Sequence, residues 1–203
     1  MTNATIESLK KRRTQYALGR TSSLSADQIE ALVKEAIRLA PSSFNSQSSR
    51  AVILFGAASD QFWALTTEAL RAVVPAENFA PTEAKLKSFA AGLGTVLFYE
   101  DQSVVADLQA KFALYADNFP VWSEQSAGMA QLAVWTALAD AGLGASLQHY
   151  NPLADAAAAK AFGVPESWKL RAQMPFGSNE APFGDKAFMD DAARFKTFHA
   201  ATA

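Results

Sequence analysis

Hydrophobic residues recur at helical spacing in several segments of the chain. The clearest segment follows Ser25, which together with Gln28 forms the sequence pattern of a capping box at a helix start. The apolar residues that then repeat every three or four positions are Ile29, Leu32, Val33, Ala36, Ile37 and Leu39. Because Pro41 cannot continue such a helix, we expect an amphipathic helix that ends just before it.

Further segments are predicted to be helical from less regular patterns. They cover residues 6–13, 59–73, a shorter stretch after Pro81, 103–116, 123–141, 156–162 and 190–199. The segment 123–141 is the longest, and its apolar residues are spread around most of its circumference. A helix of this kind is expected to be central or to lie in a subunit interface.

Short apolar runs between these segments predict strands. Residues 51–55 form an uninterrupted apolar run typical of a buried strand, and residues 95–99 have the composition of a second buried strand. Residues 145–150 resemble a third strand that runs into the turn Asn151-Pro152. Residues 170–174 alternate between apolar and polar side chains before Pro175. Helices thus interleave with strands, without a linker or repeat, and we expect one layered domain over residues 1–203.

Composition and charge exclude several classes of protein. Half of the 203 residues are apolar, which is enough for a substantial core, and the formal net charge is −2. This charge argues against the extended basic face that binding to nucleic acids or anionic membranes requires. No apolar run reaches membrane-spanning length and residues 1–5 do not resemble a signal segment, so we expect a cytoplasmic protein. With no cysteine and two distant histidines, no metal site is expected.

The most distinctive polar pattern is a run of four cations followed by a hydroxyl. Lys10, Lys11, Arg12 and Arg13 precede Thr14, and an arginine pair with a neighbouring hydroxyl suits a phosphate group. The alternative is a solvated helix end, where cations are favoured by the negative end of the helix dipole.

Other polar clusters allow both a binding and a structural interpretation. The hydroxyls and amides of Ser42–Gln47 can bind a polar ligand or their own backbone. In the segment 148–151, His149 is either a functional or a structural histidine, and Lys186 by itself is a surface lysine. The aromatic residues Tyr115, Phe119 and Trp122 form either a shelf for a substrate or part of the core.

Patterns that would supply reactive protein groups are missing from the sequence. There is no paired-carboxylate or nucleophile motif, and Gly142-Leu143-Gly144 lacks the third glycine of a dinucleotide-binding loop. If side chains bind a phosphate and the protein has no reactive group, a phosphorylated cofactor carries the chemistry.

The order of these motifs resembles the FMN-dependent nitroreductase family over nearly the whole chain. The motifs that carry the resemblance are Arg12-Arg13-Thr14, Ala40 to Gln47, Gly142-Leu143-Gly144-Ala145, and Pro175-Phe176-Gly177 with Lys186. A closer similarity is to the subgroup named for the fatty acid repression mutant protein, which includes bacterial copper-induced nitroreductases. The stretches similar to that subgroup are Tyr16–Arg20, Leu114–Gln125 and Leu147–Pro152.

The resemblance implies an α+β sandwich and a shared cofactor site. The central, mostly antiparallel sheet is flanked by helices, and two chains form an intertwined homodimer with FMN at each of two interface sites. The resemblance implies that the FMN phosphate is bound by Arg12, Arg13, Thr14 and Lys186, with Arg194 as a further candidate. Its implied flavin residues are Ser42, Ser43, Asn45 and Gln47 from the partner subunit, and Gln148 and His149, whose backbone lies by the N5 edge.

The resemblance also implies an activity, namely the reduction of nitroaromatic compounds or quinones by NADH or NADPH. Donor and small aromatic acceptor would use one site in turn, giving ping-pong hydride transfer through flavin N5. Solvent can supply the protons, so no catalytic side chain is expected. Tyr16 stands where many nitroreductases have a lysine, and Arg50 is a candidate for that charge.

Two alternative functions stay open on the sequence. One is a flavin-binding, redox-responsive regulatory protein in lipid metabolism or a stress response, as the name of the subgroup suggests. The other is a flavin-consuming enzyme of the related fold. The sequence leaves open the physiological acceptor and the choice between NADH and NADPH.

Overall fold

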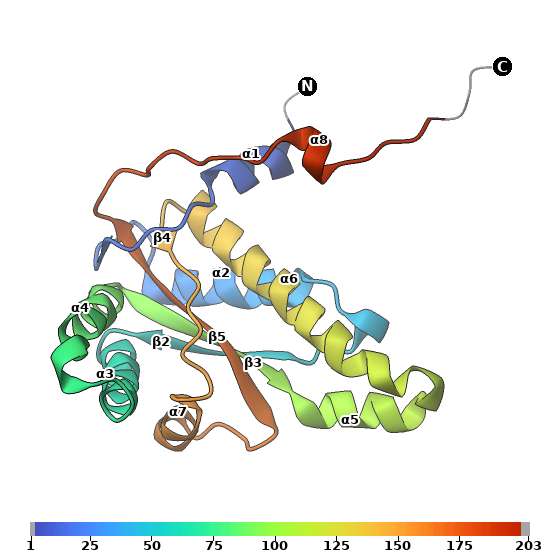
Figure 1. Cartoon of the computed structure of the whole chain (residues 1–203), viewed down its shortest axis with the longest axis horizontal. Coiled ribbons are helices and arrows are strands. Elements are labelled where there is room, and N and C mark those ends of the chain that lie inside the picture. The colour runs from blue at the N-terminus through green and yellow to red at the C-terminus, as the bar shows by residue number, and fades with distance from the viewer. Residues whose placement is uncertain (1–2, 200–203) are drawn as a thin grey trace.

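The computed structural model describes residues 3–199, in which one twisted sheet separates two groups of helices (Figure 1). The strands are β1 (Leu18–Gly19), β2 (Ser49–Phe55), β3 (Gly94–Asp101), β4 (Gly144–Ala145) and β5 (Trp168–Asn179). They are ordered β1-β5-β3-β2, with β4 also paired to β5, and all of these pairs are antiparallel. This arrangement confirms the α+β fold with a mostly antiparallel sheet.

Helices cover both faces of the sheet. They are α1 (Ala4–Lys11), α2 (Ala26–Leu39), α3 (Ala57–Arg71), α4 (Phe79–Ala90), α5 (Gln102–Lys111), α6 (Phe119–Asp140), α7 (Asp155–Phe162) and α8 (Asp191–Arg194). Helices α2 and α6 lie on one face, whereas α3, α4 and α7 lie on the other (Figure 1). The capping box at Ser25 and Gln28 is present, which confirms the predicted start of α2.

Strand β3 forms the centre of both cores because its side chains alternate between the two faces. Val96 and Phe98 pack with α2 and α6, whereas Leu97 and Tyr99 pack with α3 and α4. All residues of β3 are buried, including Glu100 and Asp101 at its end. Two carboxylates are thus placed inside the protein, where each requires hydrogen-bond partners.

Several predicted helices have different bounds in the structure. Helix α1 ends at Lys11, before Arg12 and Arg13, and α4 begins at Phe79, before Pro81. The helix expected over 103–116 ends at Lys111, and a short 3₁₀ helix, η3 (Ala113–Asn118), follows it. Helix α6 begins at Phe119, earlier than expected, with Pro120 in its first turn. Proline is tolerated there because the first backbone N–H groups of a helix have no partner within it.

Two strand predictions also need correction. Of the strand predicted over 145–150, only Ala145 lies in a strand, β4, and an isolated bridge joins Gln148 to Gln173 further on. Strand β5 continues through Pro175 to Asn179. The carbonyl of Pro175 accepts from Ser146 on the side away from β3, so the missing N–H of the proline leaves the pairing with β3 intact.

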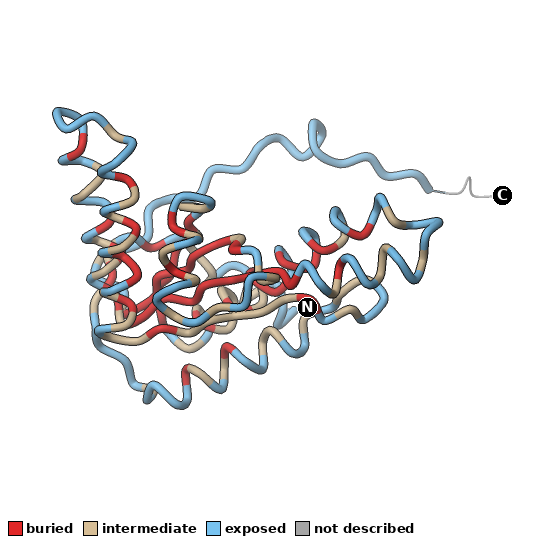
Figure 2. The backbone as a smooth tube through the Cα atoms, turned by 90° about the horizontal axis from the view of Figure 1, so that it is seen from below, coloured by how far each residue is buried: buried red, intermediate tan, exposed pale blue. Residues whose placement is uncertain are grey.

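The C-terminal segment leaves the sheet after β5 and is exposed along its length (Figures 1 and 2). The helix predicted over 190–199 is limited to α8, four residues long. Exposed apolar side chains in this segment include Phe183, Phe188, Met189, Phe195 and Phe198. The segment has too few neighbours of its own chain to bury them.

Candidate functional site

The predicted cation run is divided by the end of α1 into a paired and an unpaired half. Lys10 forms an ion pair with Glu7 at 2.8 Å, and Lys11 forms one with Asp140 of α6 at 3.0 Å. Hydrogen bonds from Ser8 and Lys11, together with the charge of Lys11, lower the pKa of Asp140. Both lysines therefore neutralise acids, and Lys11 also joins α1 to α6, so that Arg12 and Arg13 are the cations of this run left for a phosphate.

Arg12 and Arg13 have no carboxylate partner within residues 3–199. The guanidinium carbon of Arg12 lies 4.4 Å from the ring centroid of Trp135 on α6. Arg13 donates to the carbonyl of Gly184 in the C-terminal segment. A guanidinium that stacks on a ring keeps N–H donors for an anion, so both arginines can still bind a phosphate.

The C-terminal segment brings Lys186 to this cluster. Arg13 and Lys186 line the same open pocket of about 440 Å³, together with Lys10 and the apolar residues of α1. Thr14 is exposed and forms a bridge with Ala145 of β4. We call Arg12, Arg13, Thr14 and Lys186 the cation cluster.

Arg194, the further phosphate candidate, does not join the cation cluster by any contact in the described part of the chain. It lies on α8, is exposed, and its guanidinium is 5.4 Å from the ring of Phe195. Its role at the phosphate stays a prediction.

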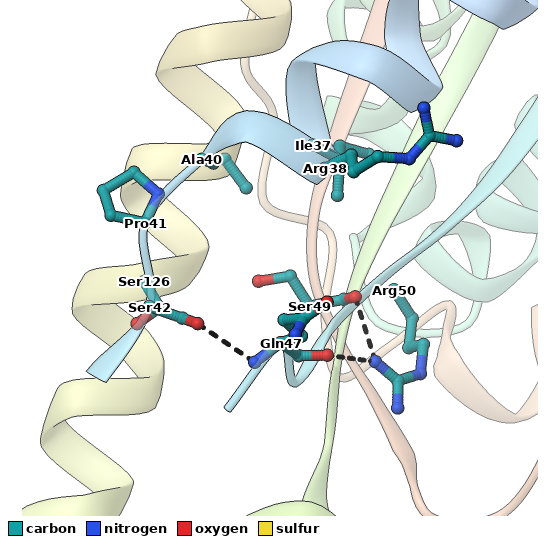
Figure 3. Close-up of a pocket in the computed structure, with 10 residues that line it drawn as sticks. Ile37, Arg38, Ala40, Pro41, Ser42, Gln47, Ser49, Arg50 and Ser126 are labelled. Atoms are coloured by element: carbon teal, nitrogen blue, oxygen red, sulfur yellow. Dashed lines mark hydrogen bonds between the residues drawn. The ribbon is translucent and has the colours of Figure 1, made fainter. Parts of the chain in front are cut away.

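The predicted flavin segment Ser42–Gln47 is a tight loop between α2 and β2, which we call the serine loop. Its two end residues, Ser42 and Gln47, are labelled in Figure 3. The loop contains a 3₁₀ helix, η1 (Ser43–Asn45). Its positive φ angles are 57° at Phe44, 49° at Asn45 and 49° at Gln47. Side chains are disfavoured in this left-handed region, so surrounding contacts must stabilise the loop.

Part of that support is local and visible beside a pocket of about 210 Å³ (Figure 3). The backbone N–H of Gln47 donates to the Ser42 hydroxyl at 3.0 Å. Arg50 donates to the carbonyls of Gln47 and Ser49 and forms an ion pair with Asp101 at 3.1 Å. The sequence analysis named Arg50 as a candidate for the charge of the lysine that Tyr16 replaces. In the structure, the Arg50 guanidinium is bound to Asp101 and to carbonyls at the end of the serine loop.

Opposing effects set the pKa of Asp101. Burial raises this pKa, whereas hydrogen bonds from Ser103 and Ser167 and the charge of Arg50 lower it by more, so that it lies below its usual value. Asp101 also caps α5 by accepting from the backbone N–H of Ser103 at 3.2 Å. The residue therefore connects the serine loop, through Arg50, to the start of α5.

Glu100 is the residue near the serine loop that the sequence analysis missed. It is 0% exposed, and its carboxylate accepts hydrogen bonds from the hydroxyls of Ser48 at 2.6 Å, Ser49 at 2.5 Å and Ser123 at 2.6 Å. The available signal was a glutamate directly after the predicted buried strand 95–99.

An aromatic cluster packs around Phe44 of the serine loop. The ring of Phe44 is 4.9 Å from Phe112, 5.3 Å from Phe119 and 5.9 Å from Trp122, with Tyr115 at 6.2 Å. Phe119 is buried, whereas Phe44 and Tyr115 are 51% and 41% exposed. The cluster is therefore partly core, at Phe119, and partly an accessible aromatic wall, at Phe44 and Tyr115. Both interpretations from the sequence, a core and a substrate shelf, thus apply to different members of the cluster.

Gln148 and His149 differ in their surroundings. The backbone of Gln148 exchanges two hydrogen bonds with Gln173, and its buried side chain donates to Ser146 at 3.0 Å. His149 is exposed. The backbone N–H of Gln148 is thus already used within the chain, so His149 has the more accessible position of the two.

Helix α6 separates the cation cluster from the serine loop. Trp135 lies under Arg12, and Ser123 contacts Glu100 beneath the serine loop. These two residues are 12 positions apart in α6, which corresponds to about 18 Å along the helix axis. The pockets next to the two regions share no residue.

An apolar groove of about 570 Å³ runs between these two regions, over α6 and between α1 and the end of α2. Its lining includes Leu9, Leu39, Met129 and Leu132, which are all exposed.

Within residues 3–199, no three histidine or acidic side chains converge on a possible metal position. None of the helices described is long and apolar enough to cross a membrane.

Comparison with known sequences adds a family context to this geometry. Residues 9–178 match the Nitroreductase family. The putative nitroreductase HBN1 of Saccharomyces cerevisiae is 37% identical over 186 residues, covering 91% of this chain and 92% of HBN1. The nitroreductase FRM2 of the same yeast is 30% identical and covers 92% of this chain and 93% of its own.

Solved structures share the fold at high and at low identity. The nitroreductase CinD from Lactococcus lactis, in complex with chloramphenicol or 4-nitrophenol, is 53% identical with a TM-score of 0.89 and covers 97% of this chain and 100% of CinD. A nitroreductase with bound FMN from Desulfitobacterium hafniense is 16% identical with a TM-score of 0.70, covering 98% of this chain and 100% of its own. At that identity the likeness concerns the fold alone.

Proposed function

The chain belongs to the nitroreductase family, and we propose that it uses FMN to reduce nitroaromatic compounds or quinones with NADH or NADPH. Similarity to FRM2 and CinD confirms the predicted subgroup. The observation that carries the cofactor proposal is the cation cluster, where Arg12, Arg13 and Lys186 have no acidic partner within the described residues.

The cation cluster fits a phosphate group by its donor chemistry. A phosphate monoester carries close to two negative charges at neutral pH. Two guanidinium groups and an ammonium group supply charge-assisted hydrogen bonds to its oxygens, and the exposed Thr14 hydroxyl supplies another donor. The open pocket beside Arg13 and Lys186 gives such a group access from solvent.

When bound, FMN would supply the redox chemistry, namely ping-pong hydride transfer through its N5 from a reduced nicotinamide to the acceptor. The chain's own residues would bind and orient the cofactor and the acceptor. The amide and hydroxyl groups of the serine loop can hydrogen-bond polar ring edges, and the wall of Phe44 and Tyr115 can stack on an aromatic acceptor.

No side chain is assigned as a catalytic acid or base. Solvent reaches both Phe44 and Tyr115, so protons can come from water. CinD binds chloramphenicol and 4-nitrophenol, and these complexes support nitroaromatic compounds as the acceptor class for this chain.

We further propose that two copies of the chain form the site. Within one chain, the cation cluster and the serine loop are separated by about 18 Å of α6 and line different pockets. A second copy that covers the apolar groove and the exposed aromatic residues of the C-terminal segment would bury them. The serine loop of one copy would then complete the site beside the cation cluster of the other.

The direct test is an anaerobic absorbance experiment. Purified protein is loaded with FMN, and the flavin band at about 450 nm is followed after NADH or NADPH is added. We expect bleaching within seconds and recovery of the band when 4-nitrophenol is added.

Protein that does not take up FMN would contradict the proposal. Bound FMN that neither nucleotide reduces would favour the regulatory alternative. Loss of the flavin band under oxygen after reduction would favour a flavin-consuming enzyme.

A further inference from the structure

We infer that Glu100 is a positioning residue that holds the serine loop in the geometry in which it binds FMN. The inference rests on the proposed function, because it assigns to Glu100 a role toward the same cofactor site. It concerns a buried carboxylate that contacts no part of the cation cluster. Its influence on FMN would pass through Ser48, Ser49 and Ser123.

The surroundings of Glu100 are unusual for a carboxylate. It is fully buried, and none of the ion pairs formed within residues 3–199 includes it. Burial of a carboxylate is unfavourable unless hydrogen bonds replace the lost water. Three serine hydroxyls provide that replacement, and Ser48 and Ser123 are themselves 1% and 7% exposed.

These three hydrogen bonds join the two structures that support the serine loop. Ser48 and Ser49 directly follow Gln47, so their bonds fix the point where the chain leaves the loop and enters β2. Ser123 follows Trp122, whose ring stacks on Phe44 in the middle of the loop. Glu100 therefore holds the end of the loop and its aromatic support in one arrangement.

The backbone of the serine loop explains why such a connection is needed. Phe44, Asn45 and Gln47 all have positive φ angles, and a strained conformation persists only when its surroundings determine it. Without the Glu100 contacts, the loop can relax to other conformations. The apparent affinity for FMN then falls by the fraction of chains in which the loop is still competent to bind.

The first test combines hydrogen exchange with FMN binding in the Glu100→Gln variant. Glutamine keeps the size of the side chain, but its single carbonyl oxygen cannot accept all three hydroxyls. In protein free of FMN, we expect the amides of Asn45, Ser46 and Gln47, which are bonded within the loop, to exchange about tenfold faster. The dissociation constant for FMN should rise by a similar factor, and exchange in β5 should stay unchanged.

A matched pair at Ser123 tests the same contact without changing Glu100. Ser123→Thr keeps the hydroxyl, whereas Ser123→Val has nearly the same shape and lacks it. A small cavity of about 10 Å³ beside Ser123 gives the added methyl groups some room. We expect the valine variant to show faster loop exchange and weaker FMN binding by about threefold, and the threonine variant to be close to the original protein.

Thr66→Val is the control for the loss of a buried hydroxyl. Thr66 is fully buried in α3, on the opposite face of the sheet, and donates to the carbonyl of Phe62. This variant should leave loop exchange and FMN affinity unchanged.

Three outcomes would overturn the inference. The first is normal loop exchange and FMN affinity in folded Glu100→Gln, and the second is a uniform rise in exchange over the whole chain, which would indicate a merely structural role. The third outcome is equal loop exchange and FMN affinity in Ser123→Val and Ser123→Thr, and this pair decides the question if Glu100→Gln does not fold. Original protein that binds no FMN would contradict the proposed function instead, while loop exchange would still report on Glu100.

Discussion

The serine loop is supported from inside the protein, whereas the cation cluster is held at the surface. Beneath the loop, Glu100 is fully buried and the ion pair between Arg50 and Asp101 is largely shielded from solvent. The cation cluster instead depends on an arginine stacked on Trp135 and on an exposed C-terminal segment that carries Lys186. The loop should therefore contribute to binding through its fixed geometry, and the cation cluster through its charge.

The largest loss of FMN affinity is expected when the charge of the cation cluster is removed. The double variant Arg13→Ala/Lys186→Ala should weaken FMN binding by at least about 3 kcal/mol, since each charged hydrogen-bond donor contributes about 1.5–3 kcal/mol. Titration of FMN fluorescence measures the change. Lys34→Ala, which removes a cation paired with Glu30 on α2, is the control and should have no effect. Similar affinities for the two variants would show that charge at the cluster does not bind FMN.

A single change at Arg12 should have a smaller effect of the same kind. Arg12→Ala is expected to weaken FMN binding by about 1.5–3 kcal/mol while the protein stays folded. Arg12→Lys keeps the charge but loses the planar fork, and should fall between the alanine variant and the original protein. Calorimetric titration compares the three proteins, and unchanged affinity in the alanine variant would remove Arg12 from the site.

Protein stability offers a comparison of the two regions that does not depend on FMN. Asp101→Asn breaks the shielded pair with Arg50, whereas Asp140→Asn breaks the exposed pair with Lys11. At pH 7 the first change should lower the free energy of unfolding by about 1–3 kcal/mol, and the second by less than about 1 kcal/mol. Urea unfolding measures both, and a larger loss for Asp140→Asn would reverse the comparison.

The pH dependence of these two variants follows from the lowered pKa values. Folding lowers the pKa of Asp101 and of Asp140 below the ordinary value of 3.8. Each carboxylate therefore contributes stability above that pH, and the contribution is lost as the pH falls through the folded-state pKa. The deficit of each asparagine variant should shrink between pH 5 and pH 2.

Salt should produce the smallest effect and separate the two regions most clearly. Raising the ionic strength from 0.05 to 0.5 M should weaken FMN binding several-fold, because exposed charges are screened. Glu100→Gln should keep this salt dependence, whereas Arg13→Ala/Lys186→Ala should lose most of it. Equal salt dependence in both variants would contradict the assignment of charge to the cation cluster.

Local sequence patterns predicted the elements that depend on nearby residues. The capping box at Ser25 and the apolar runs of β2 and β3 were sufficient because capping and burial act over a few positions. The bounds near Pro120 and Pro175 were wrong, since the effect of a proline depends on its place in the helix or on the strand edge that its missing N–H faces.

The candidate site was only partly predictable for the same reason. The motif residues near Arg12 and Ser42 were named from their order in the chain. That Lys11 is paired with Asp140, and that Glu100 joins Ser48 to Ser123, depends on contacts between residues far apart in sequence. The positive φ angles of the serine loop likewise had no glycine to indicate them.

Mixed dimers test most directly the central claim that the serine loop of one copy and the cation cluster of another bind the same FMN. One chain carries Arg13→Ala/Lys186→Ala, and the other carries Asn45→Gly/Gln47→Gly, since glycine tolerates the positive φ angles. The two chains are expressed together with different tags, and the mixed species is purified and titrated with FMN. We predict one site of original affinity per mixed dimer, because one site receives both unchanged halves. Loss of both sites would contradict the account, since each site would then be built within one chain.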